Sequence, residues 1–255
     1  MSVPPQIFNS ISRMTVGLIS KSVGGVKEYI YRGIQQLPII LASTSLVYAV
    51  ATGSMAHMNV FLGMALVIPL VTTILQALVG YGAGKIWPNS IFWKRGGGDT
   101  CNMLPSGKQE TLTYFDKNAL TGGAVPSYWM MGISYFIGYT ISNAVDSLLT
   151  PAAPGSSNVN HEKRNTHAIF VIVATVIFSA LILFVRLYYM RGCEGSSNYG
   201  IGLSLFFATW GAGIGYGMYN FSKSCGARSS DLLGILSQIL PPSATSPHPI
   251  VCAAT

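Results

Sequence analysis

Long runs of apolar residues alternate with short polar segments along most of the chain. The clearest run extends from Ala168 to Met190, where Arg186 is the single charged residue. A helix of that length crosses a hydrocarbon core about 30 Å thick. Four further runs have a similar length and each predicts another spanning helix: Leu37–Ala56, Asn59–Gly84, Ser127–Leu149 and Tyr199–Phe221. The pattern therefore predicts an all-α, polytopic membrane bundle of five spans.

The segment before the first span has a different pattern. Between Gln6 and Gln36, apolar residues recur every three or four positions, separated by lysines and arginines. This spacing predicts a basic amphipathic helix, broken near Gly24 and Gly25. Such a helix lies in the membrane interface or packs on a partner protein.

These patterns divide the chain into three regions. Residues 1–36 form the interfacial helix region, residues 37–221 form the bundle with its long loop 85–126, and residues 222–255 form a C-terminal tail. Within the tail, Asp231–Leu240 predicts one short helix capped by Ser230. The Pro- and Ser-rich end is expected to be irregular.

Composition agrees with a membrane protein. Half of the residues are hydrophobic, only 9% are charged, and 28 are glycine, which is typical of packed transmembrane helices and excludes an ordinary soluble domain. The net charge of +7 is spread over segments that flank the membrane. It therefore indicates contact with anionic lipid rather than nucleic acid. We expect no cofactor and no metal site.

Five spans assign each connecting segment to one side of the membrane. The N-terminus, the loop Lys85–Pro126 and the turn at Arg191 share one side, called here the loop side. His57, the loop Thr150–Asn165 and the tail share the other, called the tail side. Only four of the 15 lysines and arginines fall on the tail side: Lys163, Arg164, Lys223 and Arg228. The positive-inside rule therefore places the loop side in the cytosol.

The cysteines follow from this orientation. Cys101 and Cys193 fall on the loop side, whereas Cys225 and Cys252 fall on the tail side. Because the cytosol is reducing, we expect Cys101 and Cys193 to be thiols. A disulfide between them would require the opposite orientation.

Three loop-side segments carry the candidate chemistry. They read GYGAGKIWPNSIFWKRGGGDTCNMLP, GGAVPSYWMMGISYFIGY and FVRLYYMRGCEGSSNYGIGLSLFFATWGAGIGYGMY. In order, spacing and position they resemble the motifs of the phosphatidic acid phosphatase family, the membrane lipid-phosphate phosphatases. The resemblance extends from about Lys85 to Tyr219 and is greatest to forms from large DNA viruses.

The resemblance implies a phosphate clamp without its reacting groups. In that family Lys, Arg and Ser side chains hold the phosphoryl oxygens, one histidine attacks phosphorus, and a second protonates the leaving group. The residues at the clamp positions are Lys85, Arg95, Ser127 and Arg186. Trp129 stands at the position of the acid histidine. The nucleophile position falls on Gly192 or, shifted by one, on Cys193, and the aspartate position on Ser196 or Ser197.

Other histidines cannot replace the missing pair. The chain contains His57, His161, His167 and His248, and the expected topology puts all four on or near the tail side. They would lie a membrane thickness away from the clamp. We therefore expect no catalytic residues, although the sequence alone leaves enzymatic activity open.

Three functions are compatible with these features. The leading hypothesis is a non-catalytic structural or anchoring protein on a degenerate phosphatase scaffold, such as a minor capsid or inner-membrane protein of a virion, with loop 85–126 contacting a protein partner. The alternative is lipid-phosphate binding or residual phosphatase activity through the clamp. A small channel or transporter has less support, since only Asp146 and the polar character of the span Ser127–Leu149 favour it.

One further motif has a structural explanation. Glycines recur at positions 211, 213, 215 and 217 inside the last apolar run. We interpret them as small residues that allow close helix packing through the pairs Gly211/Gly215 and Gly213/Gly217.

Overall fold

The computed structural model describes residues 5–87, 93–96, 101, 123–150, 158–195, 197–225 and 232; the side chains of 5–28, 158–161 and 191 are outside this description. Nearly all of the described chain is helical. Its one strand-like feature is an isolated antiparallel bridge between Lys94 and Ala124. The expected tail helix at Asp231–Leu240 lies outside the described residues, apart from Leu232.

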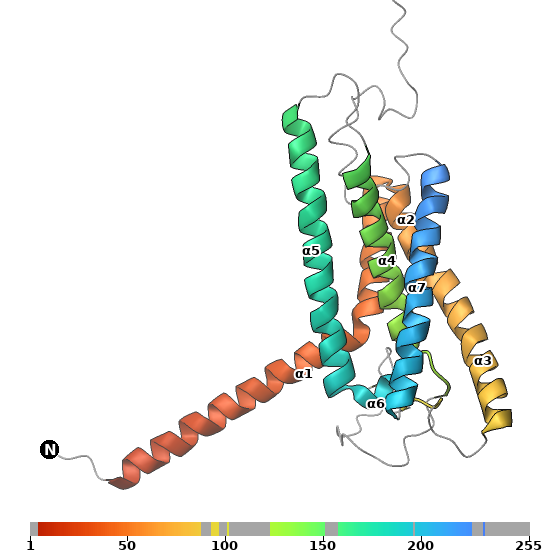
Figure 1. Ribbon diagram of the computed structural model, residues 1–255. Helices are drawn as coiled ribbons and strands as arrows, with labels where there is room; N and C mark the ends of the chain where they lie inside the picture. Colours follow the sequence, from red (N-terminus) through yellow and green to blue (C-terminus); the bar gives the residue numbers. More distant parts are fainter. Residues whose placement is uncertain are drawn as a thin grey trace, which may run out of the picture.

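The first helix, α1 (Pro5–Thr52), joins the predicted interfacial helix to the first predicted span. It is helical through Gly24 and Gly25, so the predicted break there is wrong. Figure 1 shows its N-terminal part extending away from the bundle before the helix changes direction and enters it. Pro38 lies inside the bundle portion. Since proline has no N–H, the carbonyl of Ile34, four residues earlier, loses its helical donor.

A tight hairpin follows, as the sequence predicts, but its turn is earlier. The chain reverses at Gly53, whose φ of +67° suits a residue without a Cβ. His57 therefore lies inside the next helix. That helix consists of α2 (Met55–Leu62), a π-helical turn η1 (Gly63–Val67) and α3 (Ile68–Ile86).

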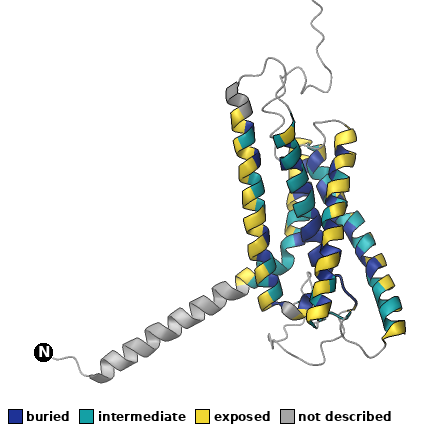
Figure 2. Cartoon of the chain, in the orientation of Figure 1, coloured by how far each residue is buried: buried dark blue, intermediate teal, exposed yellow. Residues whose placement is uncertain are grey.

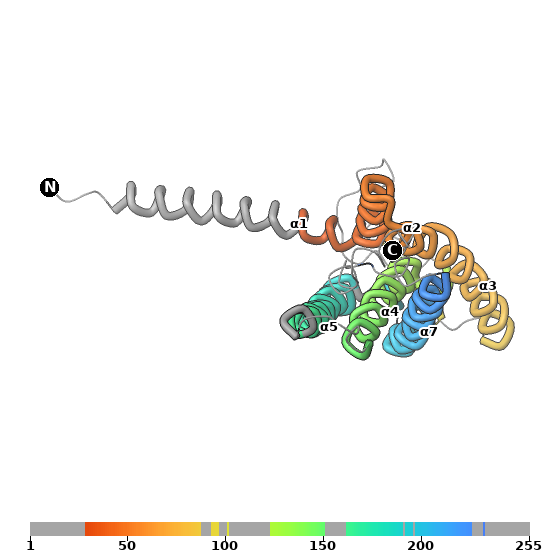
Figure 3. The backbone as a smooth tube through the Cα atoms, turned by 90° about the horizontal axis from the view of Figure 1, so that it is seen from above, coloured from red at the N-terminus to blue at the C-terminus, as the bar shows by residue number. Residues whose placement is uncertain are grey.

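The remaining elements complete the bundle. They are α4 (Tyr128–Leu149), α5 (Asn158–Tyr189), the single turn α6 (Arg191–Glu194) and α7 (Asn198–Ser224). The predicted spans from Ser127, Ala168 and Tyr199 correspond to α4, α5 and α7. The start of α5 lies within the segment that the sequence assigned to the loop Thr150–Asn165. Figures 1 and 3 show α4 between α5 and α7 in both views.

Helix α4 is the centre of the fold. More than half of its residues are buried, including Trp129, Tyr135 and Tyr139. Figure 2 shows this burial, in contrast to the exposed outer face of α5. Tyr135 donates a hydrogen bond to the Asn59 carbonyl (3.2 Å), and Tyr128 donates to the carbonyl of Met64 in the π-helical turn. These bonds join α4 to the hairpin around it.

Close approach of α4 and α7 depends on small residues. A Cβ added at Gly211 would lie 2.8 Å from the Met131 carbonyl oxygen, and one at Gly215 would lie 2.2 Å from the Tyr135 carbonyl oxygen. The predicted packing through Gly211 and Gly215 is therefore confirmed. Gly213 and Gly217 have open space at the same position, so that pair does not contribute. The backbones can approach because one helix face lacks side chains.

Four helical segments are long and apolar enough to cross a membrane: Tyr29–Thr52, Met55–Ile86, Glu162–Tyr189 and Asn198–Ser224. Length and composition thus support an integral membrane protein. The remaining predicted span, which corresponds to α4, is more polar and is not among the helices of the described chain that are long and apolar enough to cross a membrane. Its neighbours cover it, so it presents little surface to lipid.

Candidate functional site

A buried ion pair lies at the loop-side end of the bundle. Arg186 in the last turn of α5 donates from Nε to Oε1 of Glu194 in α6, at 2.7 Å. Their side chains are 1% and 0% exposed. Because a buried charge is costly without a partner, each of these residues requires the other. Glu194 was not singled out from the sequence, although it lies within the third motif, eight residues after Arg186.

Two serines complete the hydrogen bonding of the carboxylate. Ser127 Oγ donates to Glu194 Oε2 at 2.5 Å, and Ser204 Oγ lies 3.4 Å from the same oxygen. Ser127 also caps α4, because its Oγ accepts the Met130 N–H at 3.0 Å. The carboxylate thus ties together α4, α5, α6 and α7.

Trp129 packs against the ion pair. The Arg186 guanidinium carbon lies 4.8 Å from the centroid of the Trp129 ring, within cation–π range. The indole Nε1 donates to the Ile34 carbonyl at 2.6 Å, which is the carbonyl that Pro38 leaves without a helical donor. At the position where the resemblance expects an acid histidine, the protein therefore has a residue that joins α1 to α4 and packs on Arg186.

Arg95 lies beside this pair. Burial lowers the pKa of its guanidinium, the Glu194 carboxylate raises it, and the Arg186 charge lowers it again. Its Nε is buried without a hydrogen-bond partner among the described residues. Arg186 is thus the hydrogen-bonded partner of Glu194, and Arg95 acts on the same carboxylate through its charge.

The ends of the long loop are held next to Arg95. The Arg95 N–H donates to the Gly123 carbonyl (3.0 Å), and the Val125 N–H donates to the Trp93 carbonyl (3.0 Å). Gln76 of α3 donates from Nε2 to the Pro126 carbonyl at 2.7 Å. These bonds bring the segment before α4 into contact with the segment after α3.

A disulfide joins Cys101 to Cys193, with their Cα atoms 5.0 Å apart. Our prediction that these two residues are thiols is therefore wrong. Next to the bridge, the Gly96 N–H donates to the Gly192 carbonyl at 2.6 Å. Both candidate nucleophile positions, Gly192 and Cys193, are thus used to attach the loop to α6.

The clamp predicted from the resemblance is only partly assembled. Ser127 and Arg186 bind Glu194, and Arg95 interacts with that carboxylate through its charge. Lys85 lies exposed at the end of α3, where its Nζ is 5.7 Å from the centroid of the Tyr81 ring. Nothing in the described contacts connects Lys85 to the other three. Of the two positions considered for the missing aspartate, Ser197 caps α7 by accepting the Gly200 N–H, and residue 196 lies outside the described chain.

The histidines within the described residues lie away from this cluster, as expected from the order of the helices. His57 is near the Gly53 turn and bonds to Ser54 Oγ at 2.8 Å. His161 and His167 lie near the start of α5, far along that helix from Arg186. His248 lies outside the described residues.

Asp146 near the end of α4 has partners of its own. It accepts from the Tyr219 hydroxyl at 2.8 Å and pairs with Lys223 Nζ at 2.6 Å. The two charged side chains are 26% and 48% exposed, so the pair reaches the surface. This arrangement joins α4 to α7 and is accounted for by packing and solvation.

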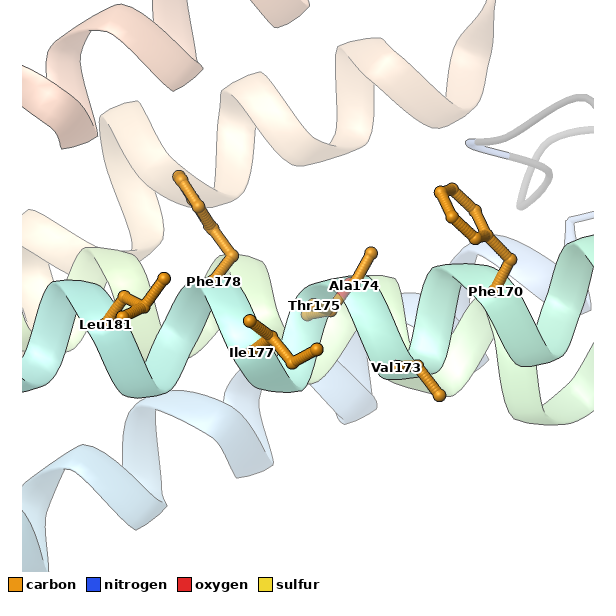
Figure 4. A pocket seen from close by; sticks show the side chains of 7 residues that line it. All are labelled: Phe170, Val173, Ala174, Thr175, Ile177, Phe178 and Leu181. Atoms are coloured by element: carbon orange, nitrogen blue, oxygen red, sulfur yellow. The ribbon is translucent and has the colours of Figure 1, made fainter.

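On the described surface, one side of α5 carries a shallow, open apolar depression. Figure 4 shows the residues that line it, and all of them come from that one helix: Phe170, Val173, Ala174, Thr175, Ile177, Phe178 and Leu181. It lies within a candidate span, where acyl chains are the natural neighbours. Among the described residues, no group of three or more His, Cys, Asp or Glu side chains is placed to hold a metal ion.

Comparison with protein-family models finds no match, and comparisons with curated proteins and with solved structures find none either. The resemblance to phosphatidic acid phosphatases therefore stays a prediction based on the motifs of the chain.

Proposed function

We propose that this chain is a non-catalytic integral membrane protein that acts as a scaffold or anchor. In this proposal α4 crosses the membrane as a fifth helix within the bundle, and loop 85–126 contacts a protein partner. The fold would be a degenerate form of the phosphatidic acid phosphatase bundle. A setting beneath a viral capsid, on the inner membrane, rests on the sequence resemblance only.

The observation that best supports this proposal is that residues of the predicted phosphate clamp bind Glu194 of the protein itself. Arg186 and Ser127 are committed to Glu194, an internal carboxylate that supplies the negative charge a phosphate would bring. Trp129 and Cys193, at positions where the resemblance expects reacting groups, support α1 and the loop. Because these side chains are used for internal contacts, the loop-side end of the bundle is better suited to a structural role than to catalysis.

A hydrolysis assay tests the absence of catalysis. Purified protein should release phosphate from phosphatidic acid or diacylglycerol pyrophosphate no faster than an Arg95→Ala/Ser127→Ala variant. Without a nucleophile and a general acid, neither nucleophilic nor acid catalysis lowers the activation barrier for hydrolysis of the phosphate ester. Turnover that is above this control and proportional to enzyme concentration would contradict the proposal.

A second experiment tests the partner loop. Residues 103–120 are replaced by a short Gly/Ser linker, which keeps Gly96, Cys101 and the Lys94–Ala124 bridge. The matched control puts the same linker in place of residues 151–157, the tail-side loop. Cross-linking of the native protein through the lysines at 94, 108 and 117 should identify a protein neighbour in the membrane. Affinity purification without cross-linker then compares the two variants, and only the first replacement should abolish capture of that neighbour. Equal capture by both variants would refute a role of the loop.

Lipid-phosphate binding remains the second candidate, since Arg95 has a buried Nε without a partner among the described residues. If Glu194 occupies a phosphate site, Glu194→Gln removes the negative charge beside Arg186, and the variant should bind an anion there more tightly than the wild-type protein. Short-chain phosphatidic acid would then stabilise this variant by about 2.7 kcal/mol at 100 times its Kd. The wild-type protein would respond less. No response in either protein would exclude this function.

A further inference from the structure

The two ends of the bundle differ in the state of their cysteines. Cys101 and Cys193, at the loop-side end, form a disulfide across 92 positions of sequence. Cys225, at the far end of α7, is exposed and free. Helix α7 has 27 residues, which corresponds to a length of about 40 Å. A membrane thickness therefore separates the bridge from the thiol.

Contacts on both sides of the bridge support the pairing independently. Gly96 bonds through its N–H to the Gly192 carbonyl, and a Cβ at Gly96 would lie 2.8 Å from that oxygen. On the other strand of the loop, Gly123 accepts from the Arg95 N–H. Next to Cys193, Glu194 is fixed by Arg186. The backbone near both cysteines is thus positioned by hydrogen bonds and by an ion pair.

We infer that the loop-side end of this protein matures in an oxidising compartment and that the tail-side end faces the cytosol. Disulfides persist outside the cytosol, whereas glutathione and thioredoxin keep cytosolic thiols reduced. In forming the bridge, the two thiols lose two protons and two electrons to the disulfide of a compartment oxidoreductase, which becomes a dithiol. The exposed thiol of Cys225 is then on the reducing side.

This orientation is the reverse of the one that the charge count predicts. The positive-inside rule is a bias from the lysines and arginines near the spans. On the loop side, Arg186 is paired with Glu194. The tail side is changed in the same way, because Lys223 pairs with Asp146 and Arg164 is buried, so these contacts leave the bias of the count in place. The charge rule is a statistical bias, whereas a disulfide cannot form without an oxidant, so the bridge decides the orientation.

The first part of the test examines the bridge in the full-length chain. In a Cys225→Ser/Cys252→Ser background, Cys101 and Cys193 are the only cysteines. Protein is quenched in acid, denatured and treated with a polyethylene-glycol maleimide. We expect no adduct without reductant and two adducts after reduction. A Cys193→Ser variant in the same background should give one adduct without reductant. Two adducts on the unreduced parent would overturn the inference.

The second part reads the orientation while the bridge is intact. In a Cys252→Ser variant Cys225 is the one remaining free thiol. On sealed vesicles with the cytosolic face outward, a membrane-impermeant maleimide should label Cys225 without detergent. Trypsin should cleave at the exposed Lys163 near the start of α5 but cleave at Lys94 only after detergent is added. Labelling of Cys225 that requires detergent, with cleavage at Lys94 in sealed vesicles, would overturn the orientation even if the bridge is present.

The inference is independent of the scaffold proposal. Phosphate release or loss of the loop's partner would contradict the scaffold but would leave these labelling results unchanged. Labelling of the opposite face would reverse the orientation without affecting the occupied clamp.

Discussion

Replacing Glu194 by glutamine should strongly destabilise the protein. The substitution keeps the shape of the side chain but leaves the Arg186 guanidinium, 1% exposed, without its counter-charge. Removing one member of a buried ion pair costs about 3–5 kcal/mol. For a chain of this size, each kcal/mol corresponds to a Tm shift of roughly 2–4 °C. The expected decrease is therefore about 6–20 °C.

The chain provides a matched control in its other ion pair. Asp146→Asn removes the same charge from the pair with Lys223, whose side chains are 26% and 48% exposed. A pair at the surface contributes about 0–1 kcal/mol, so this variant should lose at most a few degrees. Both variants change the net charge by the same amount, so a difference between their Tm values reports the burial of the ion pair and not the net charge.

The Tm of both variants is measured by thermal unfolding in the same detergent, with the fraction of protein that remains monodisperse as the signal. A double variant, Arg186→Met/Glu194→Leu, should recover most of the loss, because replacing both charges with apolar groups leaves no unpaired ion. Equal Tm values for Glu194→Gln and Asp146→Asn would refute the reasoning. They would mean that water or lipid headgroups reach Arg186 and that the pair is not buried in the membrane-embedded protein.

Three further substitutions test the packing around this site by the same unfolding assay. Gly215→Ala should lower stability by about 1–3 kcal/mol, because its Cβ would lie 2.2 Å from a main-chain oxygen of α4. Gly213→Ala, where a Cβ meets open space, should be neutral or slightly stabilising. Equal changes in stability for these two variants would contradict the packing of α4 on α7. Ser127→Ala should lower stability by about 1–2 kcal/mol through loss of the cap, and an unchanged Tm would show that the cap is dispensable. Trp129→Phe should cost about 1–3 kcal/mol, since the Ile34 carbonyl would lose its donor, whereas a neutral result would mean that water replaces the indole.

The order of the helices could be predicted from the sequence because membrane insertion requires long apolar runs whose backbone groups bond internally. Ser127 as the start of α4 and the small-residue face at Gly211 and Gly215 followed from local rules as well. The break at Gly24–Gly25 was predicted wrongly, since glycine lowers helix propensity by only about 1 kcal/mol and does not by itself end a helix.

The site depended on tertiary structure. A sequence shows that Arg186 lies in an apolar run, but its partner is whichever acid the fold brings within hydrogen-bond distance, and Glu194 reaches it only because α6 turns back beneath α5. In the same way, Trp129 occupies its place because Pro38, on a different helix, frees a carbonyl there. Cys101 and Cys193 lie 92 positions apart, so their pairing depended on where the loop returns. Local patterns determine which segments are helical, whereas the pairing of charges, donors and thiols depends on distances that only packing sets.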